Sequence, residues 1–210
     1  SGIEDVLDYF TRSPTTRLRT YLLVVKGERG QNMMNVDYPM EFIPTEAIRE
    51  MENLNGGASF TLLDVIGAAS SDGIAPVLNT VELVPSGKTD GSRHSSKFRV
   101  GKTAVFRDLK LVGFLDENVT QSFDWMTGRL RRGMLSVKSG KFAGTVALIL
   151  THTERTITVS MQDGKPKFRV LLKGRGIVEE NNTRMNLTSS KLLDLVEQEA
   201  RAVIRSQAED

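Results

Sequence analysis

The first half of the chain combines short helical patterns with apolar stretches. Apolar residues recur at positions 3, 6, 7 and 10, one face of a 3.6-residue period, which predicts a helix ending at Ser13-Pro14. Residues 18–25 are rich in Leu, Val and Tyr and predict a largely buried strand. A second helix is expected after Pro44, with Thr45 as its cap and the sequence Asn55-Gly56-Gly57 as its stop. Thr61 and Asp64 then form a capping-box pattern for a short helix through Ala69.

The second half predicts strands and two further helices. Residues 103–106 and 110–114 have the pattern of short strands joined by a turn at Asp108. A helix is expected to start at Asp116, with apolar residues at 119, 123 and 126 on one side and Gly128 at its end. A last helix, opened by Ser189-Ser190, carries apolar residues at 192, 195, 196, 203 and 204 on one side.

Between these helices the pattern predicts an antiparallel meander. We expect strands at 146–151, 156–161 and 167–179, separated by short turns, one of which contains the hairpin signal Asp163-Gly164. The last strand alternates. One face carries Phe168, Val170, Leu172 and Val178, and the other carries four basic residues, Lys167, Arg169, Lys173 and Arg175.

A connection of Gly, Ser and charged residues, PSGKTDGSRHSS at 85–96, divides the chain. The net charge is −5 over residues 1–95, from 8 basic and 13 acidic residues, and +7 over residues 96–210, from 20 basic and 13 acidic residues. We therefore predict two regions, 1–90 and 96–210, the second with the meander and the final helix. The fold class expected is α+β, with mixed or antiparallel sheets and packed helices.

Composition limits the chemistry. The chain has no cysteine, which excludes disulfides, thiol nucleophiles and Cys-ligated metals within these 210 residues. Its longest stretch without a charged residue is 142–153, shorter than the ~20 apolar residues of a membrane-spanning helix. The opening Ser-Gly is typical of a cleaved expression tag, which indicates a piece of a longer protein.

No catalytic or cofactor motif is complete. Gly101-Lys102-Thr103 lacks the glycine five positions earlier that a phosphate-binding loop needs, since position 96 is Ser. The two histidines, His94 and His152, have no spacing that places two metal ligands on one face. Asp116 and Glu117 fit a helix start better than acid–base work. We therefore expect no cofactor and no metal.

Three other features have simple structural interpretations. The four basic residues of the last strand lack the interleaved aromatic residues of a nucleic-acid surface, so they are first of all the charged outer face of a sheet. The run Arg129-Leu130-Arg131-Arg132 is interpreted as a solvated turn, and Trp125 as a packing residue.

Three segments resemble one family, in the same order. They are KTAVFRDLKLVGFLDENVTQSFDWMTGRLRRGMLSV (102–137), LDYFTRSPTTRLRTYLLVVKG (7–27) and FTLLDVIGAASSDGIAPVLNTVEL (60–83). They are similar to the Ger(x)C family, the lipoprotein C subunits of spore germinant receptors. That family begins with a signal peptide and a lipobox cysteine and usually continues past residue 210, so we expect a fragment of a multi-domain lipoprotein.

The resemblance implies a non-enzymatic subunit needed for nutrient-triggered spore germination. It would be lipid-anchored on the outer face of the inner membrane of the spore, in contact with two other receptor subunits that are integral membrane proteins. The family has no catalytic residues to carry over, and no nucleic acid is expected as a partner. Lys167, Arg169, Lys173 and Arg175 are the candidate surface for a partner or for the membrane. The alternatives are a hydrolase with a dispersed Asp/His site and, third, a nucleic-acid binder.

Overall fold

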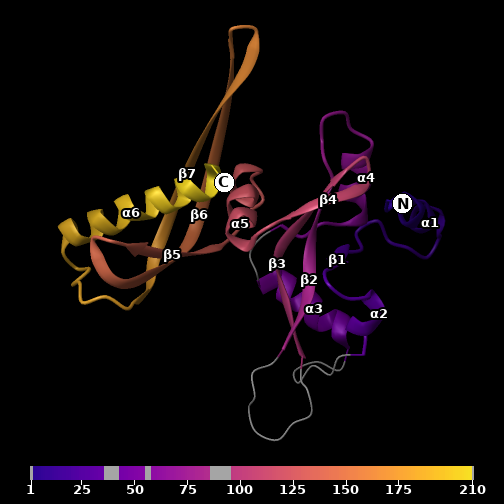
Figure 1. The fold of residues 1–210 in the computed structure, drawn as a ribbon, viewed down its shortest axis with the longest axis horizontal. Coiled ribbons are helices and arrows are strands. Elements are labelled where there is room, and N and C mark those ends of the chain that lie inside the picture. The colour runs from indigo at the N-terminus through magenta and orange to yellow at the C-terminus, as the bar shows by residue number, and fades with distance from the viewer. Residues whose placement is uncertain (1, 36–42, 55–57, 86–95, 210) are drawn as a thin grey trace, which may run out of the picture. The chain divides into compact units, whose positions relative to one another are not determined.

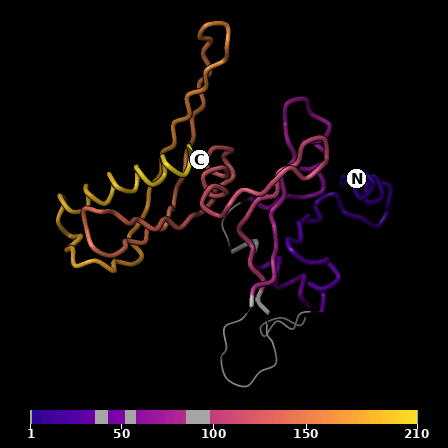
Figure 2. The backbone as a smooth tube through the Cα atoms, viewed as in Figure 1, coloured from indigo at the N-terminus to yellow at the C-terminus, as the bar shows by residue number. Residues whose placement is uncertain are grey.

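The computed structural model describes residues 2–35, 43–54, 58–85 and 96–209. In these ranges the chain forms six helices and seven strands (Figures 1 and 2), which confirms the α+β class. They group into two compact units. Unit 1 consists of Ser1–Asn55 and Ser59–Thr120, and unit 2 consists of Gly56–Ala58 and Gln121–Asp210.

Unit 1 is built on a four-stranded sheet with the order β1-β2-β3-β4. β1 (Leu23–Val25) runs parallel to β2 (Val77–Pro85), while β3 (Ser96–Arg107) pairs antiparallel with β2 and with β4 (Lys110–Leu115). The β3–β4 hairpin closes on Asp108 and Leu109, both with positive φ, which confirms the turn expected there.

Helices α2 (Gly30–Met33) and α3 (Pro44–Leu54) contribute to a buried core with this sheet. The cluster consists of Met33, Ala47, Ile48, Val81 and Phe98, and partly buried side chains of β1, β2 and β3 pack around it. Because the helices reach the apolar positions of the strands, Val81 and Phe98 are only 2% and 5% exposed.

The sequence predictions for unit 1 are confirmed in kind and adjusted at the ends. α1 (Glu4–Arg12) and α4 (Leu62–Ala69) form as expected, and Thr61 and Asp64 make a complete capping box. α3 begins at Pro44, one residue before the expected cap, and its predicted stop at 55–57 lies outside the described residues. The strand expected at 18–25 is short: only Leu23–Val25 pairs in the sheet, and Tyr21 makes an isolated bridge to Thr61.

Unit 2 has an antiparallel sheet with the order β5-β6-β7, formed by Gly133–Ser139, Phe142–Gln162 and Lys165–Asn181. The long strands β6 and β7 join at Asp163-Gly164, both with positive φ, so the predicted hairpin turn is confirmed. β5 pairs only with residues 142–150 of β6, so the rest of the hairpin is a two-stranded ribbon. We call this ribbon, residues 152–175, the arm; Figure 1 shows it extending away from the helices of unit 2.

The prediction of two strands at 146–151 and 156–161 was wrong, because they are one continuous strand. The polar residues between them, which resemble a turn in the sequence, pair with β7 from Gly174 to Leu172. Thr151 is an extra residue at this point: Leu150 lies opposite Gly176 and His152 lies opposite Arg175, so the register shifts there.

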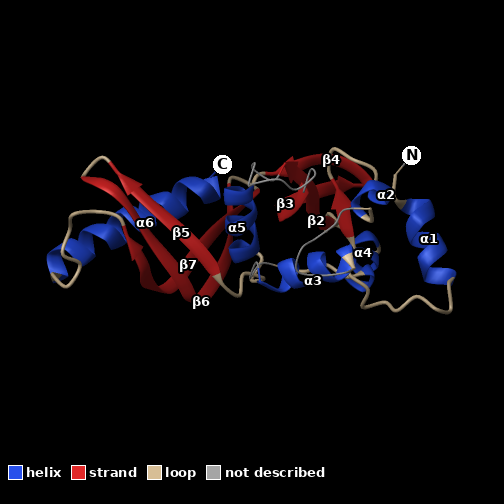
Figure 3. Ribbon diagram, turned by 90° about the horizontal axis from the view of Figure 1, so that it is seen from below, coloured by secondary structure: helices blue, strands red, loops and turns tan. Residues whose placement is uncertain are grey.

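Two helices pack on this sheet. α5 (Glu117–Met126) brings Trp125 onto Leu150, and α6 (Ser190–Glu209) covers Leu135 and Val137 with Ala200 and its neighbours. Figure 3 shows α6 lying across the strands of this sheet. Trp125, interpreted from the sequence as a packing residue, is buried at 3% exposure, whereas Phe123 and Met126, on the predicted apolar side of this helix, are only half-buried.

The expected boundary at 85–96 falls mainly on residues outside the described ranges. The strands on its two sides, β2 and β3, pair in one sheet, and the two compact units divide between Thr120 and Gln121 within α5. The division into 1–90 and 96–210 stays a prediction. In the described part of the chain, no helix is both long and apolar enough to cross a membrane.

Candidate functional site

The four predicted basic residues lie together on one face of the arm. Lys167, Arg169, Lys173 and Arg175 occupy alternating positions of β7, and all four are exposed. We call them the basic row. Leu171, half exposed at the same spacing, separates them into an outer pair near the hairpin turn and an inner pair near the sheet. Along an extended strand, four residues separate the two pairs by about 13 Å.

The two pairs differ in electrostatic surroundings. Lys173 lies opposite Glu154, and Arg175 lies opposite His152. His152 Nε2 is 2.9 Å from Glu154 Oε1, and this hydrogen bond, with the nearby charges of His152, Lys173 and Arg175, lowers the pKa of Glu154. The inner pair therefore faces a carboxylate that partly balances its charge.

The outer pair has neutral partners. Lys167 lies opposite Ser160, and Arg169 lies opposite Thr158. The Lys167 ammonium donates a hydrogen bond to Gln162 Oε1 at 2.9 Å, which orients the side chain without neutralising it. Unlike the inner pair, the outer pair therefore has no carboxylate directly opposite it across the hairpin.

The opposite face of the arm is apolar. It carries Ile157, Val159 and Met161 from β6 and Phe168 and Val170 from β7, with 43, 59, 69, 63 and 41% exposure. We call these five residues the inner face, since the register places them on the side of Leu172, which packs on Trp125 and Leu150. Exposure is lowest where the strands leave the sheet and highest beside the turn, because neither α5 nor α6 covers that end.

The base of the arm is firmly held. Trp125 Nε1 donates to the carbonyl of Glu154 at 3.1 Å, and the Thr153 hydroxyl donates to the carbonyl of Leu130 at 2.8 Å. A Cβ on Gly174 would lie 2.8 Å from the Trp125 ring, so glycine allows this close approach. Leu130, expected in a solvated turn, is buried at 7% exposure, whereas Arg131 and Arg132 beside it are exposed.

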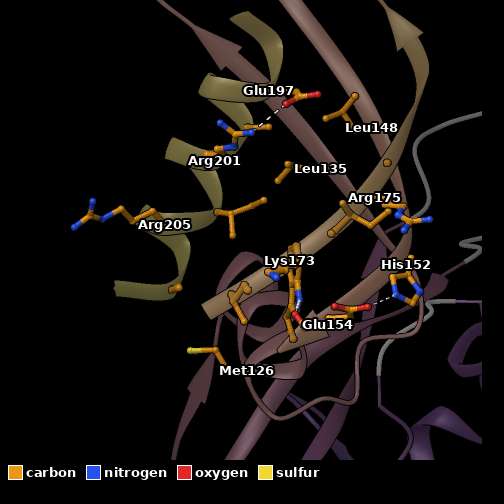
Figure 4. A pocket seen from close by; sticks show the side chains of 18 of the residues that line it. Met126, Leu135, Leu148, His152, Glu154, Lys173, Arg175, Glu197, Arg201 and Arg205 are labelled. Atoms are coloured by element: carbon orange, nitrogen blue, oxygen red, sulfur yellow. Dashed lines mark hydrogen bonds and ion pairs between the residues drawn. The ribbon is translucent and has the colours of Figure 1, made fainter. Parts of the chain in front are cut away.

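A trough of about 1400 Å³ lies in unit 2 between α6 and the β6–β7 hairpin. Leu135 and Leu148 lie on its sheet side, and Arg201 and Arg205 project from α6, where Arg201 pairs with Glu197 (Figure 4). Phe168 and Val170 of the inner face also line it. Pockets for small molecules usually enclose about 300–1,000 Å³. This open, larger trough is better suited to an extended surface than to a small substrate.

Asp124 is a buried carboxylate that sequence reasoning missed. It is 3% exposed, and its Oδ2 accepts a hydrogen bond from the Ala58 amide at 3.1 Å, which ties residue 58 to α5. Burial raises the pKa of Asp124, while the Ala58 amide and the charge of Arg129 oppose that shift. The sequence around Asp124, a polar residue next to Trp125 in a short predicted helix, contains no pattern that indicates burial of this side chain.

The other candidates from the sequence do not form a catalytic group. Gly101-Lys102-Thr103 lies within strand β3, as expected for a sequence that is no phosphate loop. Lys102 Nζ is 3.3 Å from Asp116 Oδ1, an ion pair at the start of α5. His94 lies outside the described residues. Among the residues that the structure describes, no group of three His, Asp or Glu side chains could hold a metal ion.

Two family models match the chain. Residues 101–210 match "Spore germination B3/ GerAC like, C-terminal", and residues 1–83 match "Spore germination protein N-terminal domain". These matches divide the sequence between 83 and 101, whereas the compact units divide within α5.

Curated proteins and a solved structure are similar over most of the chain. Among Bacillus subtilis (strain 168) proteins, "Putative spore germination protein YfkR" is 25% identical over 87% of this chain and 47% of its own length. "Spore germination protein B3" is 24% identical over 93% of this chain and 51% of its own. The crystal structure of the GerBC protein has the same fold, with a TM-score of 0.67 at 18% identity over 99% of this chain and 58% of that chain. The chain thus spans about half the length of the curated relatives that it matches.

Proposed function

The chain belongs to the spore germination B3/GerAC-like family, and from that premise we propose that it is part of a non-enzymatic C subunit of a spore germinant receptor. Its role would be to support nutrient-triggered germination through contacts with the membrane-embedded receptor subunits. The family match over residues 101–210 carries this proposal, and the match to the family's N-terminal domain supports it.

We further propose that the basic row is the surface that makes these contacts. Its four side chains are exposed, and its outer pair has no carboxylate opposite it. An acidic patch on a partner subunit, or the anionic leaflet beside a lipid-anchored protein, would complement such a surface. From the resemblance to lipid-anchored C subunits, we also propose that the protein is located on the outer face of the spore inner membrane.

The hydrolase alternative has little to support it. It would need a deep site around a histidine and carboxylates, but the side chains of His152 and Glu154 are 55% and 62% exposed and bind each other at the margin of the trough. A nucleic-acid surface would need aromatic residues among the basic ones, and Phe168 lies on the opposite face.

The test is to reverse the basic row, Lys167, Arg169, Lys173 and Arg175 to Glu, in the full-length protein in spores. We expect nutrient-triggered germination to slow markedly while the protein is present at normal levels. A matched control reverses four exposed basic residues outside the arm, Arg131, Arg132, Arg184 and Lys191, which changes the net charge equally. Normal germination of the first variant, or an equal defect in the control, would contradict the role of the basic row.

A further inference from the structure

The arm has one apolar face and one basic face. Its apolar side chains are exposed, whereas α6 packs on the apolar side chains of the sheet at Leu135 and Val137. A two-stranded hairpin is marginally stable alone in water and normally packs its apolar face on another layer. Here the five apolar side chains of the inner face are 41–69% exposed: Ile157, Val159, Met161, Phe168 and Val170. Contiguous apolar patches of this kind usually mark a binding surface.

The charge of the arm narrows the choice of what it binds. Residues 152–175 contain six basic and two acidic residues, a net charge of +4. One acidic residue, Glu154, already binds His152 near the sheet, and the other, Asp163, lies in the turn. An anionic partner surface fits this excess of positive charge.

The shape of the arm favours a lipid surface over a shaped protein partner. The most exposed apolar residues, Met161 and Phe168, lie beside the turn of a ribbon that projects from its unit (Figure 1). An interface of lipid headgroups and acyl chains needs no matching contour. Amphipathic elements with Lys and Arg on one face and large apolar residues on the other lie in that interface to a depth of about 5–10 Å.

We propose that the outer half of the arm, residues 157–170, lies flat in the interface of an anionic membrane. The inner face enters the acyl boundary, and Lys167 and Arg169 reach past the strand edges to the headgroups along their flexible stems. Arg155, on the inner side of β6, limits insertion at one end, and the carboxylate of Asp163 disfavours entry by the turn itself. This rests on the basic row of the proposed function and adds a buried apolar contact to it.

Two single-cysteine variants test the orientation of the arm directly. The chain has no cysteine, so Met161→Cys on the inner face and Ser160→Cys on the opposite face can each carry one environment-sensitive fluorophore. With vesicles of phosphatidylcholine and phosphatidylglycerol, we expect a blue-shifted and brighter emission from the label at 161 only. Vesicles of phosphatidylcholine alone should give little change. Equal responses at 160 and 161, or none at either, would overturn the proposal.

Sedimentation with the same vesicles measures the two contributions. Val159→Ser with Phe168→Ser should weaken binding at least tenfold, and Lys167→Glu with Arg169→Glu should do so as well, because each basic residue near an anionic surface strengthens binding about fivefold. Leu171→Ser with Ile177→Ser, which removes two exposed apolar residues from the other face, is the matched control and should bind within about twofold.

Three results would separate this proposal from the proposed function. Binding that is lost with charge reversal but unchanged by Val159→Ser with Phe168→Ser would mean a purely electrostatic contact and would overturn insertion. If the protein does not bind vesicles but dimerises through Val159 and Phe168, the inner face is a contact between two copies of the chain. That result would also overturn membrane insertion. If the protein does not bind vesicles and reversal of the basic row still impairs germination, membrane insertion is overturned while the proposed function stands.

Discussion

The strands of both sheets alternate apolar and polar residues, but the apolar residues in the core of unit 1 are buried, whereas those on the inner face of the arm in unit 2 are partly exposed. In unit 1, helices α2 and α3 reach the apolar side chains of the strands, and Phe98 is 5% exposed. In unit 2, β6 and β7 continue past the helices, and Phe168 is 63% exposed in the same kind of position. The alternation therefore determines which residues share a face, whereas the reach of the helices determines whether that face is a core or a surface.

The largest expected effect contrasts these two phenylalanines. Phe98→Ala should lower the free energy of unfolding by about 3–5 kcal/mol, because it leaves a cavity in a covered core. Phe168→Ala should cost less than about 1 kcal/mol, since its side chain already lies largely in solvent. Urea denaturation followed by circular dichroism measures both. Similar losses at the two positions would show that the arm is covered after all and remove the contrast.

A smaller effect is expected at the border between the covered and uncovered parts of unit 2. Gly174→Ala places a Cβ 2.8 Å from the Trp125 ring, and overpacking of this kind typically costs about 1–3 kcal/mol. Trp125 is the single tryptophan, so its fluorescence reports the unfolding of this region directly. Gly140→Ala is the control, because a Cβ there meets nothing within 4 Å. An equal response of the two variants would mean that the Trp125–Gly174 contact does not brace the arm.

The smallest effect concerns the buried carboxylate. Burial raises the pKa of Asp124 above its usual 3.8, so between that value and its folded pKa the folded chain binds more protons than the unfolded chain. Its contribution to stability is therefore most favourable below pH 3.8 and declines as the pH rises through the folded pKa. Asp124→Asn cannot ionise and keeps an oxygen for the Ala58 amide, so the stability of this variant relative to the natural chain should increase with pH.

Urea denaturation between about pH 3 and pH 7 measures this trend, since that range begins below the ordinary pKa of the carboxyl group and extends well above it. Asp194→Asn, an exposed position on α6, controls for the loss of one carboxylate. A stability difference for Asp124→Asn that stays flat or decreases with pH would contradict the assigned cause of the shift.

Much of the fold followed from local chemistry in the sequence. The capping box at Thr61 and the turn at Asp163-Gly164 were predictable because each depends on a few neighbouring residues. The continuity of β6 was not, since Thr153, Glu154 and Arg155 have the composition of a turn and become a strand only through pairing with β7. Tertiary context also decided which side of α5 is buried, where Trp125 and Asp124 are covered more fully than Phe123.

One face of the arm could be predicted from the sequence, and the exposure of the other face could not. Alternation placed the basic row on one face of β7, and the register agrees with that placement. The exposure of the opposite face was not foreseen, because a pattern of alternate apolar residues ordinarily means contact with a core. How far α6 extends over the sheet depends on packing between distant segments, which no local pattern contains.

The extra residue Thr151 sets the phase of the whole arm. If Thr151 were paired regularly instead of being an extra residue, strict alternation from Leu150 outward would bring His152, Glu154 and Ser160 to the side of Phe168 and send Ile157, Val159 and Met161 to the side of the basic row. Both faces would then be mixtures of apolar and polar side chains. The bulge at Thr151 therefore keeps the apolar and the basic side chains on separate faces of the ribbon, and pairing Thr151 regularly in the ladder would mix them on both faces without changing the composition of either strand.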